Sequence, residues 1–79
     1  MTLVHAIKTR IEELLQEKGM SLYKLHQTSG LYYATLMKIM QEKTVSANLM
    51  TLLQIANGFG LTISEFLDTP LFEAKNFLI

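Results

Sequence analysis

Residues 21–36 read SLYKLHQTSGLYYATL, and this stretch decides the fold. Ser21 is a natural helix cap, because its side-chain oxygen can accept a hydrogen bond from a free N–H group of the first turn. Leu22 and Leu25 then lie on the inward face of a short helix, which is broken by the run Thr28-Ser29-Gly30. A second helix is predicted to begin near Tyr32, so the stretch predicts two short helices joined by a tight turn.

The apolar residues of this stretch have the spacing of a helix-turn-helix motif. Leu25 of the first helix, Leu31 after the turn and Leu36 of the second helix can fix the crossing angle of the two helices. The turn glycine, Gly30, can adopt a backbone conformation that is costly for residues with a Cβ atom. The outward face of the second helix is then free to enter a DNA major groove.

Helical periodicity continues on both sides of this motif. A first helix is predicted from Leu3 to Lys18 and ends at Gly19; its apolar stripe is Ile7, Ile11, Leu14 and Leu15. The helix near Tyr32 carries apolar residues at Leu36, Ile39 and Met40. Asn48 can cap a fourth helix with a broad apolar face of Leu49, Leu52, Leu53, Ile55 and Ala56. Thr62 can cap a last turn or two, ending before Pro70, with inward residues Ile63, Phe66 and Leu67.

The length and composition fit a single all-α domain. The chain has 79 residues, 49% of them hydrophobic, and no cysteine that could form a disulfide or a zinc–thiolate site. A chain this short buries only about 60% of the surface that its unfolded form exposes, so its stability depends on a high apolar content. That apolar content indicates either a dense core or a surface that a partner covers. We expect a helical domain at residues 1–69 and an apolar tail at residues 70–79.

Positive charge is concentrated in the middle of the chain. The net charge of the whole sequence is zero, although nucleic-acid-binding domains are commonly basic. Residues 18–45, however, hold four lysines against Glu42 alone, a local charge of +3. This asymmetry favours an anionic ligand beside the predicted helix pair.

The sequence downstream of the motif narrows its interpretation. Residues 48–67 read NLMTLLQIANGFGLTISEFL, which closely resembles the fourth and fifth helices of the Cro/C1-type (phage-repressor-like, XRE) helix-turn-helix family. The resemblance extends over roughly residues 7–67. It implies a five-helix lambda-repressor-like domain that binds double-stranded operator DNA, usually as a two-fold dimer, with its third helix in the major groove.

The resemblance also implies which residues meet DNA. The positions that face the bases are Tyr33, Ala34, Met37 and Lys38, flanked by Tyr32 and Thr35. The positions that commonly touch phosphate are Ser21, Leu22, Gln41, Lys43 and Thr44. Lys24, Lys43 and Lys18 are also phosphate candidates from their charge, although each could be an ordinary solvated lysine.

Three residues depart from the family pattern. Leu22 replaces the usual glutamine, which leaves only backbone N–H groups for a phosphate there. His26 stands where a small residue is usual, so it must alter the approach of the two helices or point outward. Glu42 replaces a glycine, so either it adopts a left-handed conformation at a cost of about 1 kcal/mol or the third helix runs longer. Glu42 also brings negative charge close to the expected phosphates.

Several of these residues have a second interpretation. Lys38 could donate to guanine or be an ordinary solvated lysine, and Met37 could contact bases or cover the edge of its helix. Tyr32 and Tyr33 cannot both face the core, so at least one is exposed. That residue could contact a phosphate or a thymine methyl group, or one tyrosine could pack on the preceding helix; we favour Tyr33 as the base-reading residue.

The C-terminal tail is too apolar for a frayed end. One interpretation is that it folds back onto the core of its own chain. The other is that it forms a homodimer interface, which a reader of two DNA half-sites needs. The interface residues would then be Phe59, Leu61, Phe66, Phe72, Phe77, Leu78 and Ile79.

Other classes of function find little support. His5 and His26 lack the spacing of metal ligands, and no catalytic triad or phosphate-binding glycine loop is visible. We expect no enzyme activity, cofactor, metal or small-molecule ligand, and no signal peptide or membrane span, hence a cytoplasmic protein. The alternative is a protein-interaction module on the same fold, for example in a toxin–antitoxin or larger regulatory complex, binding through Tyr32, Tyr33 and Met37.

Overall fold

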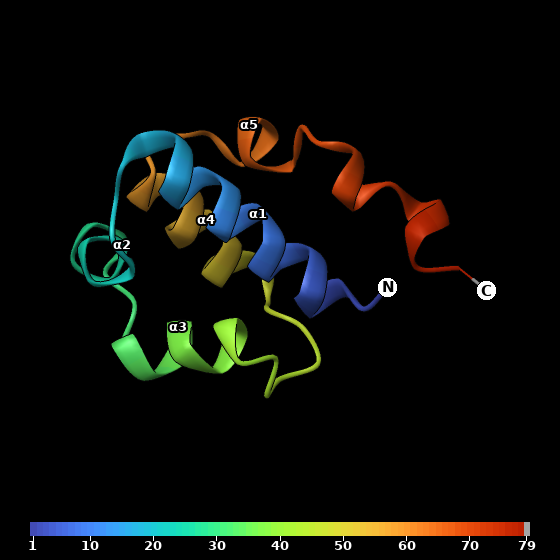
Figure 1. Cartoon of the computed structure of the whole chain (residues 1–79), viewed down its shortest axis with the longest axis horizontal. Helices are drawn as coiled ribbons and strands as arrows, with labels where there is room; N and C mark the ends of the chain where they lie inside the picture. Colours follow the sequence, from blue (N-terminus) through green and yellow to red (C-terminus); the bar gives the residue numbers. More distant parts are fainter. Residues whose placement is uncertain (79) are drawn as a thin grey trace.

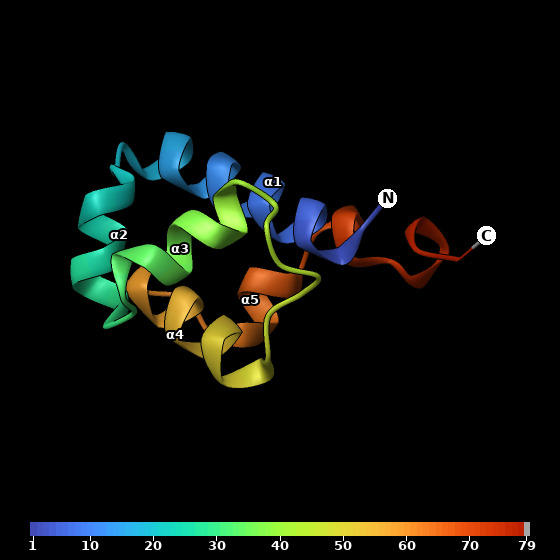
Figure 2. The ribbon, with the colours of Figure 1, turned by 90° about the horizontal axis from the view of Figure 1, so that it is seen from below.

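The computed structural model describes residues 1–78 and confirms an all-α fold. Its helices are α1 (Leu3–Lys18), α2 (Leu22–Ser29), α3 (Tyr33–Met40), α4 (Leu49–Gly58) and α5 (Ile63–Leu67). Two 3₁₀ turns follow, η1 (Pro70–Phe72) and η2 (Ala74–Asn76). Figure 1 shows α2 at one end of the molecule and the tail at the other, and Figure 2 shows α1 and α4 on opposite sides.

Local capping groups set most of these boundaries. The side chains of Thr2, Ser21, Asn48 and Thr62 each accept a hydrogen bond from the backbone N–H group three residues later. At α5 the carboxylate of Glu65 also accepts from the N–H of Thr62, which completes a capping box and lowers the pKa of Glu65. The predicted caps are therefore confirmed.

The helix-turn-helix forms as its sequence predicts. Gly30 has a φ of 75°, in the left-handed region that the turn requires. The side chains of Leu25 and Leu36 are completely buried, and Leu31 is 8% exposed. Figure 2 shows α2 and α3 side by side at one end of the molecule, with α3 between α1 and α4.

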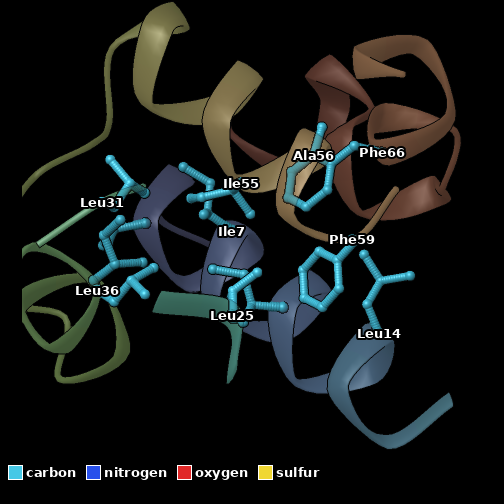
Figure 3. Close-up of a cluster of buried hydrophobic side chains, with 12 residues drawn as sticks. Ile7, Leu14, Leu25, Leu31, Leu36, Ile55, Ala56, Phe59 and Phe66 are labelled. Atoms are coloured by element: carbon cyan, nitrogen blue, oxygen red, sulfur yellow. The ribbon is translucent and has the colours of Figure 1, made fainter. Parts of the chain in front are cut away.

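One apolar core joins all five helices. Figure 3 shows side chains of α1, α2 and α4 converging on one another, together with Leu36 of α3 and Phe66 of α5. The buried apolar residues are Val4, Ala6, Ile7, Ile11, Leu14, Leu25, Leu31, Leu36, Ile39, Ile55, Ala56, Phe59 and Phe66. α2 approaches α4 most closely at Gly58, where a Cβ atom would lie 2.9 Å from both Leu25 Cδ1 and Ser29 Cβ.

Arg10 ties α5 to α1. Its guanidinium donates to the carbonyl of Phe66 from Nε at 2.8 Å and to the carbonyl of Glu65 from Nη2 at 2.9 Å. The same group lies 5.9 Å from the centre of the Phe66 ring, within the range of a cation–π contact. A short helix that cannot be stable by itself is thus held at its last carbonyls by a residue far away in sequence.

Two helices bury less apolar surface than predicted. On α4, Ile55 and Ala56 are buried, but Leu49 is 63% exposed and Leu53 is 38% exposed. On α5, Phe66 is buried while Leu67 is exposed. The prediction that Leu67 faces inward is therefore wrong, and the broad apolar face predicted for α4 is only partly buried. α4 packs against α2 and α5, and this contact leaves Leu49 and Leu53 exposed.

The first part of the tail packs on its own chain. The Phe72 ring lies 6.0 Å from that of Phe66, in the range of aromatic pairs, and η1 contacts α1. The side-chain amide of Asn76 donates to the carbonyls of Pro70 and Leu71, which closes the second turn onto the first. Beyond this point the chain runs past the N-terminal end of α1 (Figure 1). No helix within residues 1–78 is long and apolar enough to cross a membrane.

Candidate nucleic-acid interface

The outward face of α3 carries the residues predicted to face bases. Leu36 and Ile39 anchor the helix in the core, which fixes the opposite side toward solvent. On that exposed side the side chains of Tyr32, Tyr33, Ala34 and Lys38 are exposed, while Thr35 and Met37 are half-buried. The structure thus gathers all six residues on or beside one accessible helix surface.

The start of α2 lies next to this surface and carries three of the predicted phosphate contacts. Ser21 Oγ accepts the N–H of Lys24 at 3.0 Å, which leaves its own proton free to donate. The first-turn N–H of Leu22 has no partner within the helix, as is general for the first turn. Lys24 is exposed. Two donors and one cation are therefore available to a phosphate.

The segment after α3 holds the other three predicted phosphate contacts. Gln41 and Lys43 are exposed, whereas Thr44 is half-buried and its hydroxyl donates to the carbonyl of Ser46 at 3.1 Å. A pocket of about 180 Å³ opens between α3 and the start of α4. Its wall includes Lys38 and Thr44, together with hydroxyl and amide groups that the sequence interpretation did not assign: Ser46, Asn48 and Thr51.

Of the two alternatives for Glu42, the structure shows the left-handed conformation, with a φ of 54°, and α3 ends at Met40. Its carboxylate is turned toward α1, where Oε2 lies 3.1 Å from His5 Nδ1 and 3.4 Å from Lys8 Nζ. The hydrogen bond from His5, reinforced by Lys8, lowers the pKa of Glu42. This negative charge is therefore paired within the chain, and it does not stand alone beside the interface.

The ring of His26 points toward α3 and the turn, and not into solvent. His26 Nδ1 lies 2.6 Å from the carbonyl oxygen of Leu31, and the ring lies 5.7 Å from that of Tyr33. Of the two predicted tyrosines, Tyr33 thus packs on α2 and keeps 42% exposure, while Tyr32 is 82% exposed. Tyr23, which is 59% exposed on α2, joins the same rings. The sequence interpretation missed it, although its place in the first turn beside Leu22 was a usable signal.

The predicted dimer residues do not share one surface. Phe66 is completely buried and Phe59 is 4% exposed, because both side chains fill the core beneath α1. The prediction that Phe59 and Phe66 face a partner is therefore corrected. Leu61, Phe72 and Phe77 are half-buried, and Leu78 is 74% exposed. Ile79 lies outside the described residues.

The polar groups of this surface are arranged for binding a ligand more than for catalysing a reaction. They are hydroxyls, amides and lysines spread over two helices and a loop, whereas catalysis needs a nucleophile oriented by a base. Within residues 1–78, no group of three or more His, Cys, Asp or Glu side chains is placed to hold a metal ion. Hydrogen-bond donors and cations lie beside the exposed face of α3. This arrangement suits the binding of a polyanion that has a groove.

Comparison with known proteins agrees with this geometry. Residues 10–71 match the family described as the Cro/C1-type HTH DNA-binding domain. The HTH-type transcriptional regulator PuuR of Escherichia coli (strain K12) is 34% identical over 61 residues, which are 77% of this chain and 32% of that protein. The PuuR of Shigella flexneri matches to the same extent. The chain therefore spans about a third of the length of these relatives. No solved structure gives a significant match.

The family match extends from α1 to η1 and includes the whole helix-turn-helix. It confirms the resemblance inferred from residues 48–67. This chain belongs to the Cro/C1-type helix-turn-helix family of DNA-binding domains.

Proposed function

We propose that this chain is a sequence-specific, DNA-binding transcriptional regulator that acts by occupying an operator. The observation that carries the proposal is the outward face of α3, where Tyr33, Ala34 and Lys38 are accessible while Leu36 and Ile39 hold the helix rigidly to the core. A helix fixed in this way can present a constant pattern of side chains to a major groove. Its similarity to PuuR supports a role in transcription.

Affinity would come mainly from phosphates on both sides of the groove. Ser21, Lys24 and the first-turn N–H groups of α2 lie on one flank, and Gln41, Lys43 and Thr44 follow α3 on the other. Such contacts fix the register of the protein on the duplex, and the α3 side chains then discriminate between bases. In this proposal the chain binds DNA and catalyses no reaction. It acts in the cytoplasm, where its DNA target lies.

The test is fluorescence anisotropy with a labelled duplex of mixed sequence at about 50 and about 200 mM salt. If lysines neutralise about three phosphates, affinity should fall about 40-fold over this range. After selection of a preferred duplex from a random library, Lys38→Ala should weaken binding to that duplex by about 5–150-fold, and binding to the mixed duplex much less. Lys75→Ala is the matched control, because this exposed lysine lies in the tail and is not among the predicted DNA contacts.

Two outcomes would count against this function. Equal losses on the selected and mixed duplexes would show that Lys38 touches only phosphate. No binding even at the lower salt concentration would instead favour a protein-interaction module that uses the same exposed surface.

We further propose that the chain works as a homodimer whose interface includes its tail. Phe77 is half-buried and Leu78 is 74% exposed, at the end of a segment that leaves the body of the domain. Removing residues 77–79 should therefore shift the protein toward monomer in sedimentation velocity. If the truncated protein sediments unchanged, the tail does not pair subunits. The exposed outer face of α4 is then the next candidate, and Met50→Glu would test it.

A further inference from the structure

Three aromatic rings from two helices meet at the surface proposed to face DNA. Tyr23 and His26 of α2 have ring centres 5.6 Å apart, and Tyr33 of α3 lies 5.7 Å from His26 and 6.3 Å from Tyr23. The His26 and Tyr33 rings meet edge to face, with an interplanar angle of 79°. This is the arrangement that aromatic pairs prefer. We refer to Tyr23, His26 and Tyr33 as the ring cluster.

His26 is the fixed member of the ring cluster. Its Nδ1 atom lies 2.6 Å from the carbonyl oxygen of Leu31. A carbonyl oxygen can only accept, so Nδ1 carries the proton and donates it. The N–H of Leu31 in turn donates to Ser29 Oγ at 3.2 Å. Both backbone groups of Leu31 are thus bound to the end of α2, and the His26 ring is held against the turn that sets the angle between α2 and α3.

Tyr32 and Tyr33 are neighbours in sequence but differ in their surroundings. Tyr33 is 42% exposed and contacts two rings of α2, whereas Tyr32 is 82% exposed. In the part of the chain that the structure describes, Tyr32 belongs to none of the aromatic pairs. A free surface tyrosine loses rotamer freedom when it binds DNA, and one already held loses less.

We propose that His26 is a positioning residue for DNA recognition, and that it acts by holding the Tyr33 ring in the orientation with which α3 meets a base. Tyr23 closes the other side of the ring. The proposal rests on the proposed DNA-binding function. It assigns the reading of bases to Tyr33 and not to Tyr32. It also gives a role to His26, the bulky residue where α2 and α3 cross. Avoiding the immobilisation of one side chain is worth about 2–10-fold in affinity.

A double-mutant cycle tests this inference, with the duplex that the wild-type chain selects from a random library as the probe. His26→Asn is the central variant, because its side-chain amide nitrogen can still donate to the carbonyl of Leu31 while the ring is lost. Tyr33→Ala removes the residue that is held, and Tyr32→Ala is the matched control on the adjacent residue. Thermal unfolding followed by circular dichroism establishes that each variant is folded at the temperature of the binding assay.

His26→Asn is expected to weaken binding about 2–10-fold in the wild-type and Tyr32→Ala backgrounds. In the Tyr33→Ala background it should have no further effect, because there is no ring left to position. A general loss of structure could not produce this pattern, since it would weaken binding in all three backgrounds alike.

Two results would overturn the inference while leaving the DNA-binding function intact. One is an equal loss from His26→Asn in the wild-type and Tyr33→Ala backgrounds, which would mean that His26 acts independently of Tyr33. The other is unchanged binding by folded His26→Asn. Absence of binding by the wild-type chain itself would overturn both proposals together.

Discussion

Replacing Phe66 with alanine should remove a large part of the free energy of unfolding of the domain. Phe66 is the largest completely buried side chain of the domain, and its ring contacts Phe72 of the tail and the guanidinium of Arg10. Truncating such a phenylalanine costs about 3–5 kcal/mol. A domain of this length has a total unfolding free energy of only about 4–12 kcal/mol. The single change therefore removes between a quarter and all of the stability.

Urea denaturation followed by the helical circular dichroism signal measures this effect. The midpoint should fall sharply for Phe66→Ala and only modestly for Phe66→Leu, which keeps most of the apolar volume. Leu67→Ala is the matched control, because that side chain is exposed on the same helix and its loss should cost about 1 kcal/mol or less. A Phe66→Ala midpoint close to that of the wild type would contradict the central place of α5 in the core.

The same residue shows why part of the fold could be predicted from sequence. The α5 boundaries follow from local chemistry, since Thr62 and Glu65 form a capping box within one turn. The attachment of α5 to α1 depends instead on Arg10, which is far away in sequence and holds the last carbonyls of the helix. Local patterns encode the first property and not the second. The sequence predicted Phe66 to face inward, which is confirmed, but the dimer interpretation also assigned it to a partner surface, because no local pattern shows which chain covers an apolar residue.

The candidate site divides in a similar way. The exposed face of α3 could be predicted, because the spacing of Leu36 and Ile39 leaves one side of the helix free. The partners of Glu42 and His26 could not be predicted. Glu42 is bound by His5 and Lys8 across the molecule, and the direction of the His26 ring depends on where the turn places a carbonyl group. These contacts exist only after the helices have packed.

A change in packing at Gly58 should affect DNA binding as well as stability. It lies in α4 where α2 crosses, and a Cβ atom there would lie 2.9 Å from Leu25 Cδ1, 2.9 Å from Ser29 Cβ and 3.1 Å from Ser29 Cα. The last of these is a backbone atom, so rotation of a side chain cannot relieve the contact. The carbonyl of Gly58 also accepts from Thr28 Oγ1 at 2.9 Å, a bond that weakens if α2 moves away.

Gly58→Ala should therefore destabilise the domain, although the same change in an open helix would stabilise it. Overpacking costs about 1–3 kcal/mol, against a gain of about 1 kcal/mol in helix propensity, so the expected net loss is about 0–2 kcal/mol. Gly58→Val should cost about 3 kcal/mol, because it adds volume and a branched Cβ. Gly60→Ala is the matched control. Gly60 has a φ of 73° and nothing within 4 Å of a Cβ atom, so its cost of about 1 kcal/mol is conformational strain alone.

The decisive comparison is DNA affinity at a temperature where all the variants are folded. Moving α2 away from α4 displaces Ser21, Lys24 and the rings of Tyr23 and His26 relative to α3. A misplacement of this kind in a binding surface costs affinity even in a folded protein. Gly58→Ala should lower affinity about tenfold, a loss of about 1.4 kcal/mol, while Gly60→Ala leaves it unchanged. If the two variants lose stability but bind DNA equally well, the position of α2 does not matter for recognition. Affinity that falls only at Gly58 would show that the crossing of α2 and α4 sets the geometry with which the helix-turn-helix meets DNA.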